Sequence, residues 1–154
     1  MERTLYLIGT RHSAQKGLLG APEHEYQEFR ELVEQSVSAL GIRTIGEEMS
    51  RAALGENTFS IARQAAERAE IIHLFCDPNH EEREALKIRE GDVHAREAEW
   101  MRRLQSIEFP VLFICGATHV AAFASICRNE AIDVTVLHDD WDSPGCTLGR
   151  HTII

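Results

Sequence analysis

Five short apolar segments recur along this chain of 154 residues, and they constrain its fold more than any other feature. The clearest of them, such as 5–8 and 111–115, are apolar in unbroken runs rather than at every second position, which is typical of strands buried on both faces of a parallel sheet. Helical segments lie between them, as parallel connections require. The sequence therefore predicts an α/β fold: a three-layer single domain with a mostly parallel central sheet of about five strands. The predicted strands cover 4–8, 43–47, 71–76, 110–115 and 133–137.

The segments between these strands carry signals for helix starts and ends. Gly41 follows the longest amphipathic stretch and is expected to end a helix there. Asn57, Thr58 or Ser60 is expected to cap the next helix, which is rich in alanine. The predicted helices cover 23–40, about 57–69, 93–107 and 119–129. Residues 1–138 are expected to form the single α/β domain, and 139–154 a C-terminal tail.

Composition excludes several classes of protein. The net charge is −9 and the 16 Lys and Arg residues are scattered, so long nucleic acid is not an expected partner, although a local basic pocket remains compatible with a small phosphorylated ligand. No apolar stretch approaches the roughly 20 residues that span a bilayer. The start of the chain lacks the apolar region and cleavage site of a secretory peptide. We therefore expect a cytoplasmic protein without a membrane segment.

The four cysteines are far apart and form no Cys-x-x-Cys pair, which favours reduced thiols over disulfides or a cysteine-based zinc site. Several common catalytic motifs are also missing. The chain contains no P-loop, no dinucleotide-binding Gly-x-Gly-x-x-Gly, no Gly-x-Ser-x-Gly elbow and no His-Glu-x-x-His. P-loop nucleotide hydrolysis, nicotinamide chemistry and serine hydrolysis therefore lack their usual motifs.

Two copies of the pattern Gly-x-x-His follow predicted strands near opposite ends of the chain. The first is Gly9-Thr10-Arg11-His12 and the second is Gly116-Ala117-Thr118-His119. In an open parallel sheet, ligands bind beyond the carboxyl ends of the strands. A glycine there lets the backbone turn sharply. The two phrases therefore predict a shared site that contains His12 and His119.

Carboxylates follow two other predicted strands and are expected at the same edge. Glu47 and Glu48 end the second strand, and Asp77 follows the third. Two imidazoles and one or two carboxylates form a plausible ligand set for a divalent metal ion, with zinc, manganese or iron as candidates. The same residues are also suited to acid–base chemistry without a metal. Adjacent extended residues point to opposite faces, so we expect only one of the two glutamates to enter the site.

Each candidate also has a purely structural interpretation. In this interpretation the histidines form hydrogen bonds to the backbone of a loop. The glutamates are either exposed to solvent or face the positive end of a helix. Asp77 followed by Pro78 is the pattern of a helix N-cap with proline at the first helical position. Arg96 has the alternatives of stacking on Trp100 or pairing with a helix acid. The opposite expectation for Arg96 is that it reaches the cleft and holds an anionic group.

Four stretches of this sequence together resemble the TraB/Tiki superfamily, which is grouped with erythromycin-esterase-like and ChaN-like proteins. They are Leu7–His12, Glu47–Arg51, Arg96–Glu97 and Val111–His119. Members of the superfamily are described as α/β proteins with a metal-dependent hydrolase or protease site. The resemblance thus implies an α/β hydrolase.

Carried over by position, the resemblance implies His12, His119 and Glu48 as metal ligands, and Glu48, Glu47 and Arg96 as catalytic residues. The expected function is metal-assisted hydrolysis of a small or peptide-like substrate at the carboxyl edge of the sheet. The alternative is a non-catalytic or regulatory module that binds a small anion or haem. An exposed edge strand and the acidic surface also permit a homodimer.

Overall fold

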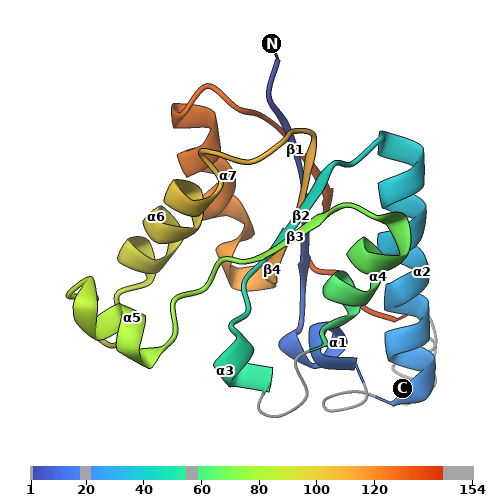
Figure 1. The fold of residues 1–154 in the computed structure, drawn as a ribbon, viewed down its shortest axis with the longest axis horizontal. Helices are drawn as coiled ribbons and strands as arrows, with labels where there is room; N and C mark the ends of the chain where they lie inside the picture. The colour runs from blue at the N-terminus through green and yellow to red at the C-terminus, as the bar shows by residue number, and fades with distance from the viewer. Residues whose placement is uncertain (1, 18–21, 55–58, 144–154) are drawn as a thin grey trace, which may run out of the picture.

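The computed structural model describes residues 2–17, 22–54 and 59–143 (Figure 1). The strands are β1 (Thr4–Thr10), β2 (Thr44–Glu47), β3 (Ile72–Phe75), β4 (Val111–Gly116) and β5 (Asp133–His138). The helices are α1 (His12–Lys16), α2 (Glu23–Leu40), α3 (Arg51–Leu54), α4 (Ile61–Ala69), α5 (His80–Ala85), α6 (Val93–Arg103) and α7 (Val120–Asn129). A short 3-10 helix, η2 (Ala117–His119), directly precedes α7.

The five strands form one sheet in the order β3-β2-β4-β1-β5, and every pairing is parallel. The predicted α/β class with a parallel five-stranded sheet is therefore confirmed. Because the strands are parallel, their carboxyl ends lie at one edge. β1 and β4 are neighbours, and Gly9 of β1 lies opposite Cys115 of β4. This pairing brings the ends of the two Gly-x-x-His strands together.

Helices cover both faces of the sheet and enclose a hydrophobic core on each side. Figure 1 shows α2 and α4 on one side of the strands and α6 and α7 on the other. Successive residues of β4 alternate between the two cores: Ile114 lies in the core that contains Phe29 of α2, whereas Phe113 packs against Trp100 and Phe123. Burial on both faces explains why the strand is apolar without interruption.

Most predicted elements are confirmed, with differences at their ends. α2 ends at Leu40, and its C-cap Gly41, with a φ of 62°, takes the left-handed conformation that glycine tolerates. Ser60 caps α4 by accepting a hydrogen bond from the backbone N–H of Arg63. The alternative caps at 57 and 58 lie outside the described residues. α6 ends at Arg103 rather than at the predicted 107.

The prediction that Asp77 caps a helix opened by Pro78 is wrong. The N-cap of α5 is Asn79, and Glu82 completes a reciprocal capping box with it. The Asp77 carboxylate instead accepts hydrogen bonds from arginine and tryptophan side chains, as described below. The short helices α1 and α3 were not among the predicted elements, because each spans too few residues to show a clear period. A helix near α5 was expected only in the structural interpretation of Asp77 and Pro78.

The described part of the predicted C-terminal tail, residues 139–143, packs against the sheet. The Trp141 ring is buried with its centroid 5.2 Å from that of Phe29. Its backbone N–H donates to the carbonyl of Gly9 at 2.7 Å, and the Thr10 hydroxyl donates to its carbonyl at 3.1 Å. Among the helices of the described residues, none combines the length and apolar character needed to cross a membrane.

Candidate functional site

The two Gly-x-x-His phrases converge on the residue that follows β2. His12 opens α1 directly after β1, and His119 ends η2 directly after β4. Glu48 lies between them, because its backbone N–H donates to the carbonyl of Ile114 and extends the pairing of β2 with β4 by one residue. The structure therefore brings together three of the predicted site residues.

The Glu48 carboxylate is the centre of this group, and its side chain is only 3% exposed. Its Oε1 accepts the backbone N–H of Gly116 at 2.8 Å, and its Oε2 accepts Nη2 of Arg96 at 2.8 Å. Nε2 of His12 lies 3.6 Å from Oε1, and Nε2 of His119 lies 3.3 Å from Oε2. Each carboxylate oxygen thus faces one imidazole nitrogen.

Both histidine rings are held from behind by a hydrogen-bond acceptor. Nδ1 of His12 lies 2.8 Å from Oε1 of Gln15, and Nδ1 of His119 lies 3.0 Å from Oε2 of the fully buried Glu97. These acceptors favour the proton on Nδ1, which directs an unprotonated Nε2 toward Glu48. On each side of the carboxylate, an Nε2 lone pair then faces a Glu48 oxygen. A further proton or a cation between the two atoms stabilises this arrangement.

The glycine of the second phrase makes this convergence sterically possible. A Cβ on Gly116 would lie 3.2 Å from Oε1 of Glu48, 3.5 Å from Nε2 of His12 and 3.6 Å from Cδ2 of His119. The glycine of the first phrase has another role: a Cβ on Gly9 would lie 2.4 Å from a methyl group of Val120. One glycine leaves room for the site, and the other for the packing of α7.

Arg96 reaches the cavity from α6 and also lies over the Trp100 ring, so features of both interpretations are present. Its Nη2 binds Glu48, its Nε donates to Oδ1 of Asp77 at 3.0 Å, and its guanidinium carbon lies 5.8 Å from the centroid of the Trp100 ring. Asp77 also accepts Nε1–H of Trp100 and Nη2–H of Arg83, both at 3.0 Å. Asp77 therefore fixes the arginine that holds Glu48.

Glu47 points away from this group, in agreement with the expectation that only one of the two glutamates enters the site. Its fully buried Oε2 accepts the Ser60 hydroxyl at 2.8 Å and lies 2.9 Å from Nε2 of His73. Glu47 therefore belongs to a second polar cluster, on the side of the sheet covered by α4.

A cavity of about 140 Å³ opens beside Glu48. Its lining includes His12, Lys16 and Arg96, three groups that carry or accept positive charge. The volume lies below the roughly 300–1,000 Å³ of a site for a drug-sized ligand, so the cavity fits one small chemical group. A carbonyl or a small anion is of the right size and polarity.

Cys115 lies close to this group but is not suited to act as a nucleophile. Burial raises the pKa of its thiol well above the ordinary value, and the nearby charges of Glu48 and Glu97 raise it further. The thiol is therefore neutral at physiological pH, whereas the thiolate is the reactive form. The described cysteines Cys76, Cys115 and Cys127 are all free, and Cys146 lies outside the described residues.

The donor types around Glu48 fit a divalent metal ion. Two imidazole Nε2 atoms with acceptors behind their Nδ1 atoms form the arrangement found at metal-bound histidines, and each Glu48 oxygen retains a lone pair. The separations of 3.3 and 3.6 Å resemble the spacing of about 3.3 Å between ligands in tetrahedral zinc sites. Across the described ranges, however, no three His, Cys, Asp or Glu side chains are gathered closely enough to hold an ion.

Sequence reasoning did not assign roles to Gln15 and Glu97, which orient the histidines. A local signal existed for Gln15, three residues after His12 on one helix face. Glu97 belongs to the Arg96–Glu97 stretch of the resemblance, but its contact with His119 depends on how α6 packs against α7 and could not be inferred from sequence.

No family model, curated protein or solved structure matches this chain. What the fold and the site define is an α/β domain with a histidine–carboxylate group at the carboxyl edge of its sheet.

Proposed function

We propose that this protein is a hydrolase for small or peptide-like substrates, with His12 and His119 acting at a site organised by Glu48. The observation that supports this proposal is the placement of two imidazole Nε2 atoms against the two oxygens of one buried carboxylate. Structural histidines do not require this convergence from distant parts of the chain. General acid–base chemistry does, because it needs proton-accepting groups positioned beside the reacting atoms.

In this proposal the cavity side chains have separate tasks. His12 is about half exposed and lines the cavity, so its Nε2 accepts the proton of a water molecule that attacks the substrate carbonyl. It returns this proton to the leaving oxygen or nitrogen as the bond from that atom to the carbonyl carbon breaks. Arg96 stabilises the negative charge that develops on the substrate oxygen. The Glu48 carboxylate stabilises the positive charge that His12 gains with this proton. His119 is held against Glu48 by Glu97. Glu47 takes no part, since it lies in the other cluster.

A metal-dependent form of the proposal replaces the proton-accepting role of His12: His12, His119 and Glu48 would then be the ligands of a divalent metal ion. When bound, it would lower the pKa of a water molecule and polarise the substrate carbonyl. The protein groups that position it are Gln15 and Glu97, which set the tautomers of the two histidines.

The test measures hydrolysis of p-nitrophenyl acetate and of a dipeptide p-nitroanilide by purified protein, after chelation and after addition of zinc, manganese or iron. We expect His12→Ala and His119→Gln to lower kcat/KM by about 10²–10⁴-fold, the usual contribution of an acid–base group. The control is His80→Ala, since His80 is exposed on α5 and pairs only with Glu84 among the described contacts. Thermal unfolding confirms that each variant is folded.

Equal rates for wild type and both site variants would contradict the hydrolase. Equal and negligible metal content in all of them under saturating supply would remove the metal from the proposal. The alternative function, binding of a small anion, is favoured by Lys16 and Arg96 in the cavity lining. It predicts thermal stabilisation by inorganic phosphate that is lost in Arg96→Gln but retained in both histidine variants.

A further inference from the structure

β3 lies at one edge of the sheet, so part of its main chain faces away from the other described strands. β3 is the first strand in the sheet order, and no strand of the described residues pairs with its outer side. Ile72 N–H and Cys76 N–H donate to carbonyls of Arg43 and Glu47 on the β2 side. Because successive residues of a strand alternate their hydrogen-bonding direction, His73 and Phe75 direct their N–H and C=O groups outward.

Only part of this edge is occupied by side chains. The Phe75 carbonyl accepts Nη1–H of Arg103 at 3.2 Å. The remaining outward groups are the main-chain N–H and C=O of His73 and the main-chain N–H of Phe75. Exposed strand edges of this kind are templates for pairing with another extended chain.

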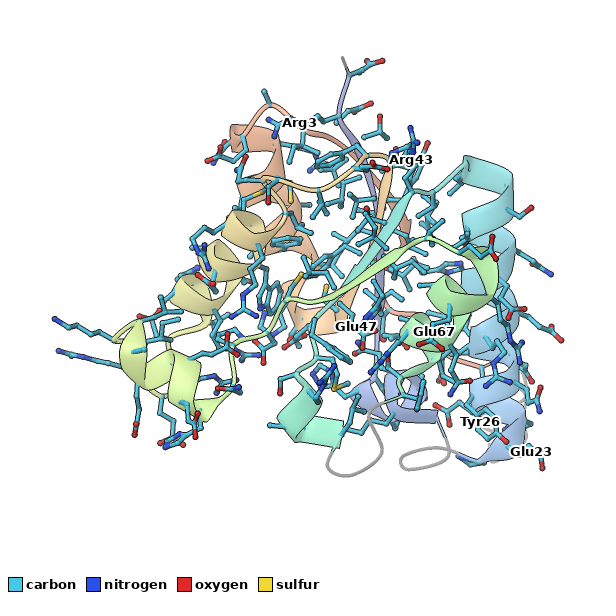
Figure 2. The ribbon with its side chains drawn as sticks, in the orientation of Figure 1. Arg3, Glu23, Tyr26, Arg43, Glu47 and Glu67 are labelled. Atoms are coloured by element: carbon cyan, nitrogen blue, oxygen red, sulfur yellow. The ribbon has the colours of Figure 1, made fainter. Side chains whose placement is uncertain are left out.

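A groove of about 490 Å³ runs over this edge. Its floor includes His73 and Phe75, one wall comes from α4 with Arg63 and Glu67, and the other wall includes Asn79 and Arg103. Figure 1 shows α4 on one side of β3 and α5 and α6 on the other, and Figure 2 labels Glu67 on α4 and Glu47 at the end of β2.

The groove lies next to the cavity at Glu48. Ser50 and Asp77 line both of them. Asp77 is also the residue that fixes Arg96. A chain lying along β3 therefore approaches the proposed catalytic group from the side of Ser50 and Asp77.

The floor of the groove is rigidly supported from below. The Nε2 of His73 bonds to the fully buried Glu47, which also accepts the Ser60 hydroxyl at the N-cap of α4. This contact ties β3 to the start of α4. The outward main-chain groups are thus held in place before any partner arrives, which reduces the entropy cost of binding.

We propose that the outer edge of β3 and this groove bind one extended peptide chain through main-chain hydrogen bonds, with one end of the chain directed to Glu48. The binding mode is addition of a strand to an exposed sheet edge. This inference rests on the proposed function, for which it supplies the way the substrate is held. The occupant is a single chain rather than a second copy, because β3 of another copy carries the same flanking helices α4 and α5.

The test uses fluorescein-labelled octapeptides, one of alternating threonine and valine and one of alternating threonine and lysine, with single N-methyl groups moved along each peptide. Anisotropy measures binding, and amide hydrogen exchange measures protection of His73 and Phe75. We expect binding to weaken about tenfold or more when a methyl group blocks an amide that faces β3, and to change little at the next residue. Exchange at His73 and Phe75 slows when the unmethylated peptide is present.

Glu67→Trp narrows the groove from a wall position that is more than half exposed, and it should weaken peptide binding. The matched control is Glu31→Trp, an exposed position on α2 away from the groove. Loss of binding equally in both variants, no binding up to millimolar peptide, or insensitivity to N-methylation would overturn the proposal. Protection of His73 and Phe75 that rises with protein concentration without peptide would overturn it in favour of a second copy.

Two readouts separate this inference from the proposed function. Hydrolysis of p-nitrophenyl acetate without peptide binding would reject the groove and leave the hydrolase standing. The opposite result is peptide binding that alternates in its sensitivity to N-methylation and is retained in His119→Gln, without any hydrolysis. It would reject the hydrolase and leave the peptide groove standing.

Discussion

At the scale of single residues, the two glycines of the repeated pattern have different roles. Gly9 matters for the stability of the fold, and Gly116 for the geometry of the site. A methyl group on Gly116 would meet Glu48 and the two histidines at 3.2–3.6 Å, distances that small side-chain shifts relieve. A methyl group on Gly9 would meet the backbone carbonyl of Asp139 at 2.3 Å and a methyl of Val120 at 2.4 Å. Neither of those neighbours is the end of a flexible side chain.

We therefore expect opposite outcomes for the two alanine variants. Gly116→Ala displaces Glu48 and lowers kcat/KM for p-nitrophenyl acetate by up to ~100-fold, with little loss of stability. Gly9→Ala destabilises the protein by ~1–3 kcal/mol, as overpacking of a core does. Urea unfolding and ester hydrolysis of both variants check this. An unchanged rate in Gly116→Ala would show that the close approach of the three side chains is not needed.

The same scale shows what the sequence can predict about the site. His12 and His119 carried a signal, because a glycine after an apolar run marks the end of a strand. Glu48 was distinguishable from Glu47 only in part: alternation along an extended chain separates them but does not say which one faces the histidines. The choice depends on the burial of Glu47 with Ser60 and His73, which are distant in sequence.

At the scale of elements, α6 connects the site to the groove. Arg96 and Glu97 on this helix hold Glu48 and His119, and Arg103 reaches the carbonyl of Phe75 on β3. Near its end, the Glu99 carboxylate accepts hydrogen bonds from Arg102 and Arg103. Hydrogen bonding to Arg102 is the main cause that lowers the pKa of Glu99, with Arg103 adding to it.

This lowered pKa predicts a pH-dependent stability effect of Glu99→Gln. A carboxylate whose pKa is lower in the folded state stabilises the protein above its ordinary pKa, and this contribution is lost as the pH falls through the folded-state pKa. We expect the variant to be ~1–2 kcal/mol less stable at neutral pH, since one partner arginine is exposed. The difference should shrink below the ordinary pKa of about 4.5.

Urea unfolding of wild type and Glu99→Gln from neutral pH to about pH 3.5 measures this difference. Glu31→Gln, at an exposed position on α2, serves as the control and should show little difference at any pH. A gap between wild type and Glu99→Gln that stays constant down to the lowest pH would contradict the assigned cause.

At the scale of the whole molecule, the sequence predicts the layers but not the order of the strands. Unbroken apolar runs such as that of β4 show that both faces of the central strands are covered, which indicates the three-layer class. They carry no information on neighbours, so the order β3-β2-β4-β1-β5 and the exposed edge of β3 emerge only from the structure. The groove on that edge was equally invisible, because its walls come from helices on opposite faces of the sheet.

The segment 139–143 was predicted to be part of a C-terminal tail because of its polar residues. In the structure it packs against the sheet through one side chain, that of Trp141. Trp141 fills the core beside Phe29, and its backbone closes over the end of β1, directly before His12. We expect Trp141→Ala to lower stability by ~3–5 kcal/mol, the usual cost of removing a buried tryptophan. Since Gly9 and Thr10 lose their support, ester hydrolysis should fall as well.

Val136→Ala on β5 provides the comparison, because Val136 is one of the exposed large apolar residues and its truncation leaves no cavity. Urea unfolding of both variants, with ester hydrolysis measured under conditions where each is folded, separates global from local effects. Equal stability of the two variants would mean that residues 139–143 add nothing to the core. A stable Trp141→Ala with normal hydrolysis would mean that β1 positions His12 without this segment.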